Sequence, residues 1–179
     1  AKPDTIAYGS SGIGSNTHLM GEQLNTLAGI KLKHVPYKGS TFSLQDMLAG
    51  VIPSMFDPIT TNVGHINSGK VRLLGVTTAK PVDAVKEVPT IAASGLPGTK
   101  GFNSAIWFGI FAPKGTAPGL VSLLNRELAA MVLSEETRRA FSTQGMDAAT
   151  STPEAFAQLV ERDAARWAQL IKARQITAE

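Results

Sequence analysis

The sequence lacks cysteine, a continuous basic stripe and any long apolar run, and these absences narrow the classes of function. The absence of cysteine fits an exported protein that avoids oxidation chemistry, although many cytosolic proteins lack cysteine as well. The net charge is only +3 and the basic residues are scattered, so nucleic acid is not an expected partner. No apolar run approaches the roughly 20 residues that cross a bilayer. The composition is that of an ordinary globular chain.

The residue patterns of common catalytic and metal sites are also missing. The histidines, His18, His34 and His65, fall on different predicted elements and have no metal-ligand spacing. The nucleophile elbow G-x-S-x-G is absent. Among the acidic residues, Asp57 at the end of a predicted strand is the better candidate to face a ligand, whereas Asp46 lies within a predicted helix and is expected to be solvated. No catalytic residue, metal or cofactor is therefore expected.

The most informative stretch is residues 8–19, YGSSGIGSNTHL. A strand is predicted to end at Tyr8, and the glycines that follow allow a loop whose backbone approaches a ligand closely. Ser15 or Asn16 can cap a helix that continues to about Ala28. The free N–H groups and the dipole of a helix N-terminus favour an anion. We call residues 9–16 the glycine loop.

The spacing within the glycine loop excludes two familiar nucleotide motifs. A Walker A loop ends in Gly-Lys-Ser/Thr, and the loop has no lysine. The glycines at 9, 12 and 14 give G-x-x-G-x-G, the reverse of the dinucleotide fingerprint. A small carboxylate suits this loop better than a nucleotide, and a tight strand-to-helix turn without a ligand is the alternative. His18 either contacts the ligand or serves in packing and capping, whereas His34 is expected to be structural.

Downstream, predicted strands alternate with predicted helices, which indicates an α/β fold with a parallel or mixed sheet flanked by helices. The expected strands are 31–37, 51–56 and 71–77, and the expected helices are 41–49 and 59–67. In such a sheet the ligand lies beyond the carboxyl ends of the strands. That edge is expected to collect the glycine loop, Lys38-Gly39-Ser40, Asp57 and Thr77-Thr78.

The C-terminal part begins with a loop-rich region, 79–100, that contains one helical turn near residues 90–93. The apolar run 102–112 is expected to be a strand long enough to cross between two sheets. Helices are predicted at 118–132 and 135–144, followed by an amphipathic helix whose start shows the capping-box spacing of Ser151 and Glu154. The apolar side of that last helix is expected to pack on the core.

Several segments resemble the periplasmic solute-binding receptors of tripartite tricarboxylate transporters, of the Bordetella-uptake type. The resemblance covers nearly the whole chain in colinear order, and it rests on the segments YGSSGIGSNTHL (8–19), HVPYKG (34–39), MFD (55–57), GKVRLLGVTT (69–78), VPTIAASGLPG (88–98) and WFGIFAP (107–113). It implies a periplasmic-binding-protein-like fold of two α/β domains around a cleft. It also implies a periplasmic location, a small carboxylate ligand and delivery to a membrane permease.

By position, the resemblance places the ligand contacts in three loops. Backbone N–H groups, hydroxyls and helix N-termini are expected to hold the carboxylate, often with ordered water. The expected site residues are Ser10, Ser11, Gly14, Ser15, Asn16, His18, Gly39, Ser40 and Asp57.

The chain departs from the family pattern because the Pro-Phe-x-x-Gly-Gly loop of the first domain is absent. Residues 3–105 are expected to form the second domain, and residues 106–179 to hold the return strand and helices of an incomplete first domain. Self-association or domain swapping through residues 102–179 is the expected way to cover the exposed apolar surface. Two alternatives to a receptor stay open: a self-associating remnant without a ligand, and an enzyme that acts on a small acid through Asp57 or His18.

Overall fold

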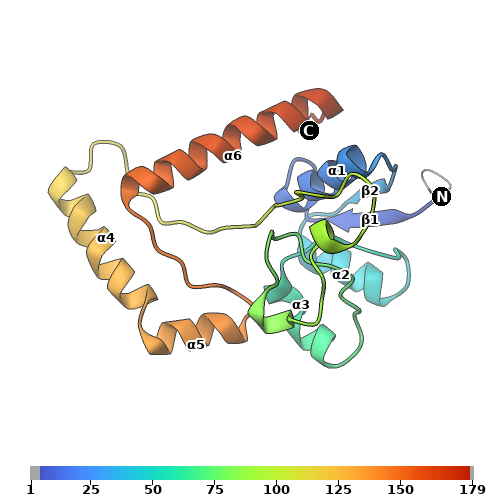
Figure 1. The fold of residues 1–179 in the computed structure, drawn as a ribbon, viewed down its shortest axis with the longest axis horizontal. Helices are drawn as coiled ribbons and strands as arrows, with labels where there is room; N and C mark the ends of the chain where they lie inside the picture. The colour runs from blue at the N-terminus through green and yellow to red at the C-terminus, as the bar shows by residue number, and fades with distance from the viewer. Residues whose placement is uncertain (1–4, 178–179) are drawn as a thin grey trace.

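The computed structural model describes residues 5–177, which fold around a small parallel sheet and extend into a long helical arm (Figure 1). The elements, in chain order, are β1 (Ala7–Ser10), α1 (Asn16–Ala28), β2 (Lys33–Pro36), α2 (Ser40–Leu48), α3 (Ile59–Asn67), the 3₁₀ turns η1 (Asp83–Val85) and η2 (Ile91–Ala93), α4 (Pro118–Val132), α5 (Glu135–Thr143) and α6 (Pro153–Arg174).

The sheet is built on β1, which has a parallel neighbour on each side. β2 pairs with it in a register that sets Tyr8 beside His34. On the other side, Gly9 forms a single parallel bridge with Met55, with hydrogen bonds from Gly9 N to Ser54 O and from Phe56 N to Gly9 O. The strand predicted over 51–56 is therefore confirmed only at its end, because residues 51–53 form a bend instead.

The core lies between β1 and helices α1 and α2. Tyr8 is fully buried, and Leu19 and Met20 of α1 are almost fully buried beside it. Gly21 permits this close packing, since a Cβ atom there would lie 2.4 Å from two ring carbons of Tyr8. The predicted helices 16–28, 41–49 and 59–67 are confirmed within one residue at each end.

Two predicted strands are wrong. Residues 71–77 are largely irregular, with a single parallel bridge between Val76 and Thr90, and Leu74 is 73% exposed rather than buried. Residues 102–112 are extended but belong to no strand. Within residues 5–177, their one backbone-to-backbone hydrogen bond to a distant segment is that of the Ser104 N–H to Thr77 O. Both runs have the apolar composition of a buried strand, but within residues 5–177 no neighbouring strand pairs with them.

The C-terminal helices form an arm that leaves the sheet and returns to it (Figure 1). After residues 106–117 cross away from the sheet, α4 and α5 turn back, and α5 packs near η1. The long helix α6 then runs back until its end meets α1, where Arg174 forms an ion pair with Glu22. Its N-cap is Thr152, whose hydroxyl accepts the Ala155 N–H, so the predicted capping box at Ser151 is displaced by one residue.

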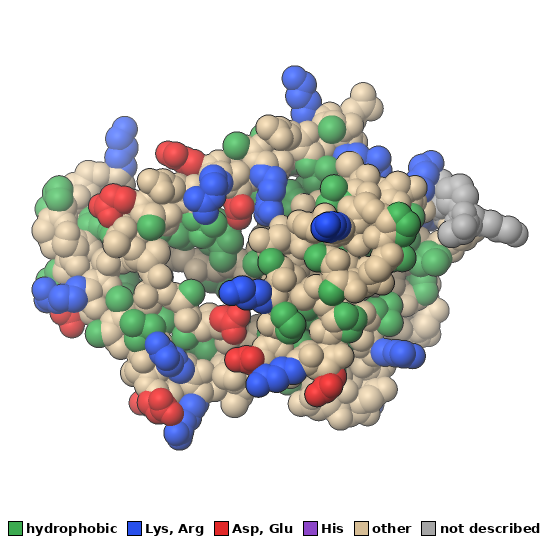
Figure 2. Space-filling view, in the orientation of Figure 1, with side chains coloured by type: hydrophobic (Ala, Val, Ile, Leu, Met, Phe, Trp, Pro, Cys, Tyr) green, Lys and Arg blue, Asp and Glu red, His purple; other side chains and the backbone are tan. Residues whose placement is uncertain are grey.

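Apolar side chains remain uncovered along the arm. Figure 2 shows hydrophobic groups gathered around a hollow beside the helical arm. Phe108 and Ile110 are 78% and 72% exposed. The opposite side of this segment packs on α6, where Trp107 and Phe111 contact the ring of Phe156. The segment is thus covered by a helix on one face only.

Candidate functional site

Three of the four predicted loops emerge together at the carboxyl edge of the sheet. The chain leaves β1 after Ser10, whose carbonyl accepts the Tyr37 N–H at 3.2 Å. On the other side the Phe56 N–H bonds to Gly9 O at 3.2 Å, immediately before Asp57. The glycine loop, residues 38–40 and Asp57 therefore begin side by side. The fourth loop, 77–78, is instead tied to Ser104, whose N–H donates to Thr77 O, and the next residue, Ala79, donates to Asn103 Oδ1.

Ser10 and His18 lie behind the glycine loop and face its backbone. Ser10 is fully buried, and its hydroxyl accepts the Gly12 N–H at 3.2 Å and lies 2.6 Å from His34 Nε2. His18 is 6% exposed and accepts the Gly14 N–H at Nδ1, 3.0 Å away. His18 is thus packed beneath the loop and bonded to its backbone.

Thr17, which was not among the predicted site residues, organises the front of the loop. Its Oγ1 accepts the Ser11 N–H at 2.9 Å and lies 3.0 Å from the hydroxyls of Ser11 and Ser15. Ser15 is the N-cap of α1, and its hydroxyl also donates to Gly12 O at 2.7 Å. A hydroxyl residue in the first turn of a helix that follows a serine-rich loop is the signal that would have identified Thr17.

The donors that remain free are at the N-termini of two helices. Within the described residues, no hydrogen bond engages the amides of Asn16 and Thr17. Helix α2 begins at Ser40 after Gly39, whose φ of 125° suits glycine and which provides no side-chain cap. Since α1 and α2 start at the ends of adjacent parallel strands, two partly positive helix ends lie at one edge of the sheet.

Asp57 has one engaged carboxylate oxygen and one free oxygen. Its Oδ2 accepts hydrogen bonds from Thr61 Oγ1 and from Asn62 Nδ2, the latter at 2.6 Å, so it organises the start of α3. Its Oδ1 is buried and has no partner among the described residues. Asp57 thus presents an acceptor, not a donor, and suits a hydroxyl group or a bridging water better than a carboxylate.

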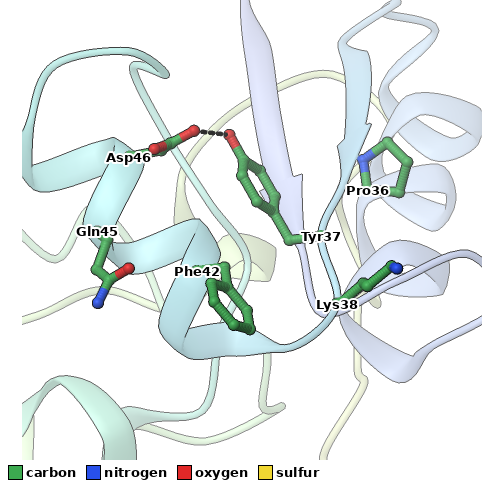
Figure 3. Close-up of a pocket in the computed structure, with 6 residues that line it drawn as sticks. All are labelled: Pro36, Tyr37, Lys38, Phe42, Gln45 and Asp46. Carbon is green, nitrogen blue, oxygen red and sulfur yellow. Dashed lines mark hydrogen bonds between the residues drawn. The ribbon is translucent and has the colours of Figure 1, made fainter.

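A shallow pocket lies beside residues 38–40 on the flank of α2 (Figure 3). Its volume is about 390 Å³, and it is lined by Pro36, Tyr37, Lys38, Phe42, Gln45 and Asp46. Tyr37 donates to Asp46 Oδ2 at 2.8 Å, and burial followed by this hydrogen bond raises the pKa of Tyr37. Asp46 is half-buried and bonded, which corrects the prediction that it is simply solvated.

A buried polar network supports the site from the interior and links it to α6. Glu22 accepts hydrogen bonds from Tyr8 Oη at 3.1 Å, from Asn25 at 3.1 Å and from Arg174 at 2.7 Å. Burial, followed by the charge of Glu22, raises the pKa of Tyr8. Sequence reasoning missed this network, although His18, Glu22 and Asn25 are spaced as one polar stripe of a helix.

Residues 5–177 contain neither a candidate metal site nor a helix that could span a membrane. No group of three or more histidine, cysteine or acidic side chains is arranged to hold a metal ion. Across the same residues, every helix is too short or too polar to span a membrane.

An α/β fold whose loops gather at the carboxyl edge of a parallel sheet occurs in many ligand-binding proteins, and solute-binding proteins are among them. The family model of the tripartite tricarboxylate transporter family receptor matches residues 1–176, and the chain belongs to this family. The family and its structural neighbours are solute-binding proteins, not enzymes, so the prediction of a non-enzymatic protein is confirmed and the enzyme alternative is dropped.

Curated relatives come from several bacteria. A UPF0065 protein of the tcbD-tcbE intergenic region of Pseudomonas sp. is 37% identical over 94% of this chain and 50% of its own length. BugT of Bordetella pertussis is 31% identical over 96% of this chain and 52% of its own length. The chain thus spans about half the length of these two proteins. A UPF0065 protein of Pseudomonas knackmussii is 37% identical over 90% of this chain and 94% of its own length.

Solved structures share the fold. Rpa4515 of R. palustris, described with adipate, superposes with a TM-score of 0.86 at 32% identity, over 98% of this chain and 58% of that one. MatC of Rhodopseudomonas palustris, with bound malate, has a TM-score of 0.75 at 27% identity, over 94% of this chain and 57% of that one. The predicted periplasmic-binding-protein-like fold and the resemblance to Bug-type receptors are confirmed.

Proposed function

We propose that this chain forms one carboxylate-binding lobe of a periplasmic receptor that delivers a small carboxylate to the membrane permease of a tripartite transporter. The observation that carries the proposal is the pair of helix N-termini, α1 and α2, placed at the ends of adjacent parallel strands. Two solved relatives described with adipate and malate support a dicarboxylate as the ligand class.

The carboxylate is held mainly by backbone N–H groups. The free amides of Asn16 and Thr17 supply donors from α1, and the amide and hydroxyl of Ser40 supply donors from α2. Hydrogen bonds from backbone N–H groups to an ionised acceptor are charge-assisted and need no basic side chain. The hydroxyls of Ser11 and Ser15 border the same site.

Of the remaining predicted residues, four act through the shape of the loops and Asp57 acts as an acceptor. Gly14 and Gly39 have positive φ angles of 73° and 125°, which let the backbone turn its amides toward the ligand. Ser10 and His18 hold the glycine loop from behind. Asp57 Oδ1 accepts from a hydroxyl of the ligand or from a bridging water.

We divide the chain into two lobes that are consecutive in sequence. Residues 3–105 are assigned to the binding lobe and residues 106–179 to a second lobe, and residues 3–4 and 178–179 of these ranges lie outside the described part of the chain. The extended apolar segment at the start of the second lobe is covered on one face only. Within residues 5–177, the backbone of 105–112 forms no hydrogen bond to another segment. A first-domain segment would cover Phe108 and Ile110, and a second copy of this chain is the alternative occupant. Light scattering of the purified chain separates a monomer from a self-associated species.

Titration calorimetry with adipate and malate tests the proposal through the Asn16 amide. Asn16 is the first residue of α1, a position where proline is well tolerated, and Ser15 before it is already extended. Asn16→Pro removes one N–H donor and keeps the helix, so affinity is expected to fall about tenfold or more. The matched control is Glu135→Pro, the first residue of α5, which is remote from the sheet. Equal affinity of Asn16→Pro and the unmodified chain would contradict the assigned donor.

A further inference from the structure

The two histidines of the binding lobe form a stacked pair beneath the glycine loop. The ring centroids of His18, on α1, and His34, on β2, are 3.7 Å apart, with the ring planes inclined by only 6°. His18 is buried and His34 is half-buried.

Each ring of the pair is tied to the loop by one hydrogen bond. His18 Nδ1 accepts the Gly14 N–H at 3.0 Å, which requires a lone pair on that nitrogen. His34 Nε2 lies 2.6 Å from the hydroxyl of Ser10, which in turn accepts the Gly12 N–H. Through these contacts the pair fixes the loop backbone at two of its glycines.

We propose that His18 and His34 are positioning residues that keep the glycine loop in its binding conformation only while both rings are uncharged, so that acid weakens carboxylate capture. A proton on His18 turns Nδ1 into a donor that faces the donor N–H of Gly14, and the bond between them is lost. A proton on His34 places a positive charge against the stacked ring. The effect on ligand capture rests on the proposed function, whereas the effect on the loop does not.

The charged and titratable groups around the pair do not neutralise such a proton. Glu22 of α1 is the nearby carboxylate, but it already accepts hydrogen bonds from Tyr8 of β1 and from Arg174 of α6. Burial lowers the pKa of His18, and the charge of Glu22 opposes this shift. Burial, followed by the charge of His18, lowers the pKa of His34 to about 4, again against Glu22. Both rings are therefore uncharged at neutral pH, and acid protonates them.

The first test follows the hydrogen exchange of the Gly14 amide by NMR while the histidine rings titrate. In the unmodified chain, the Gly14 protection factor is expected to fall about tenfold between neutral pH and about pH 4. His18→Asn, which places an oxygen acceptor near the Nδ1 position and cannot take up the proton, is expected to keep Gly14 protected across that range. His18→Phe, which keeps a flat ring without an acceptor, is expected to lose the protection already at neutral pH.

The control is His65→Gln, which changes the histidine of α3 and is expected to leave the Gly14 profile as in the unmodified chain. Circular dichroism of each variant shows that the fold is kept. Gly14 protection that stays constant while His18 titrates would overturn the proposal. Protection in His18→Phe equal to that of the unmodified chain would overturn it as well.

The second test measures adipate and malate affinity by calorimetry at neutral pH and at about pH 4. Protonation of the ligand is common to all variants, so only the difference between variants counts. The unmodified chain is expected to lose at least about threefold more affinity in acid than His18→Asn. Equal losses would refute the link between the pair and capture. Failure of both ligands to bind at neutral pH would refute the proposed function, while the Gly14 measurement still decides the positioning role.

Discussion

Gly21→Ala is expected to destabilise the chain because it places a methyl group inside the core. Gly21 lies in α1 opposite Tyr8, which is fully buried. The new Cβ atom would lie 2.4 Å from Tyr8 Cε2 and Cζ and 2.7 Å from its hydroxyl, closer than any side chain tolerates. Tyr8 is also held by hydrogen bonds to Glu22 Oε1 and to His18 O, so it cannot shift without losing them.

The change in the free energy of unfolding combines one stabilising and two destabilising contributions. Replacement of glycine by alanine inside a helix stabilises it by about 1 kcal/mol. Overpacking of a close-packed core costs about 1–3 kcal/mol, and displacement of the Tyr8 hydroxyl costs about 1–2 kcal/mol more. The net loss is about 2 kcal/mol in the free energy of unfolding. For a chain of 179 residues this lowers Tm by about 4–8 °C.

Thermal unfolding followed by circular dichroism tests this, with Gly64→Ala as the matched control. Gly64 lies within α3, and a Cβ atom there would have no neighbour within 4 Å. The same substitution should therefore give only the helical gain of about 1 kcal/mol and raise Tm by about 2–4 °C. A Gly21→Ala variant as stable as the unmodified chain would refute the packing of α1 on Tyr8.

Other parts of the lobe give three more predictions. Ser15→Ala removes the cap bond to the His18 N–H and should lower Tm by about 2–4 °C in scanning calorimetry. Arg174→Met removes the ion-pair partner of Glu22, whose side chain is 9% exposed, and should lower the free energy of unfolding by about 2 kcal/mol. A double variant with Glu22→Gln should lose less stability than the sum of the two single losses. In urea unfolding, the free energy of unfolding should fall by up to about 3 kcal/mol as the pH drops from about 6.5 to 4, because His34 takes up a proton in the unfolded chain before it does so in the folded chain, where its pKa is about 4. His34→Gln should flatten this fall. An unchanged pH dependence in that variant would contradict the lowered pKa of His34.

Local signals were sufficient to predict most helices. Caps and periodicity act over one or two turns, so the helix from Asn16 to Ala28 and the proline-initiated α4 and α6 follow from neighbouring residues. The strands predicted over 71–77 and 102–112 failed for the opposite reason. A strand needs a partner, and apolar composition alone does not supply one.

The candidate site was predictable in place but not in detail. Parallel strand topology brought the glycine loop and residues 38–40 together, as expected. The internal bonding of the loop was not predictable, because the bonds of Thr17 and His18 depend on the exact backbone path. The contact between Glu22 and Arg174 depends on tertiary packing between the first and last helices, which no local pattern reports.

The contact of α6 with α1 also sets an order of events during synthesis. Arg174 and Glu22 are 152 residues apart, so the lobe that contains the glycine loop leaves the ribosome long before the residue that clamps it. At typical translation rates the interval is about 8–30 s, whereas helices and short loops form in microseconds. Until α6 has been synthesised, Glu22 has only Tyr8 and Asn25 as hydrogen-bond donors.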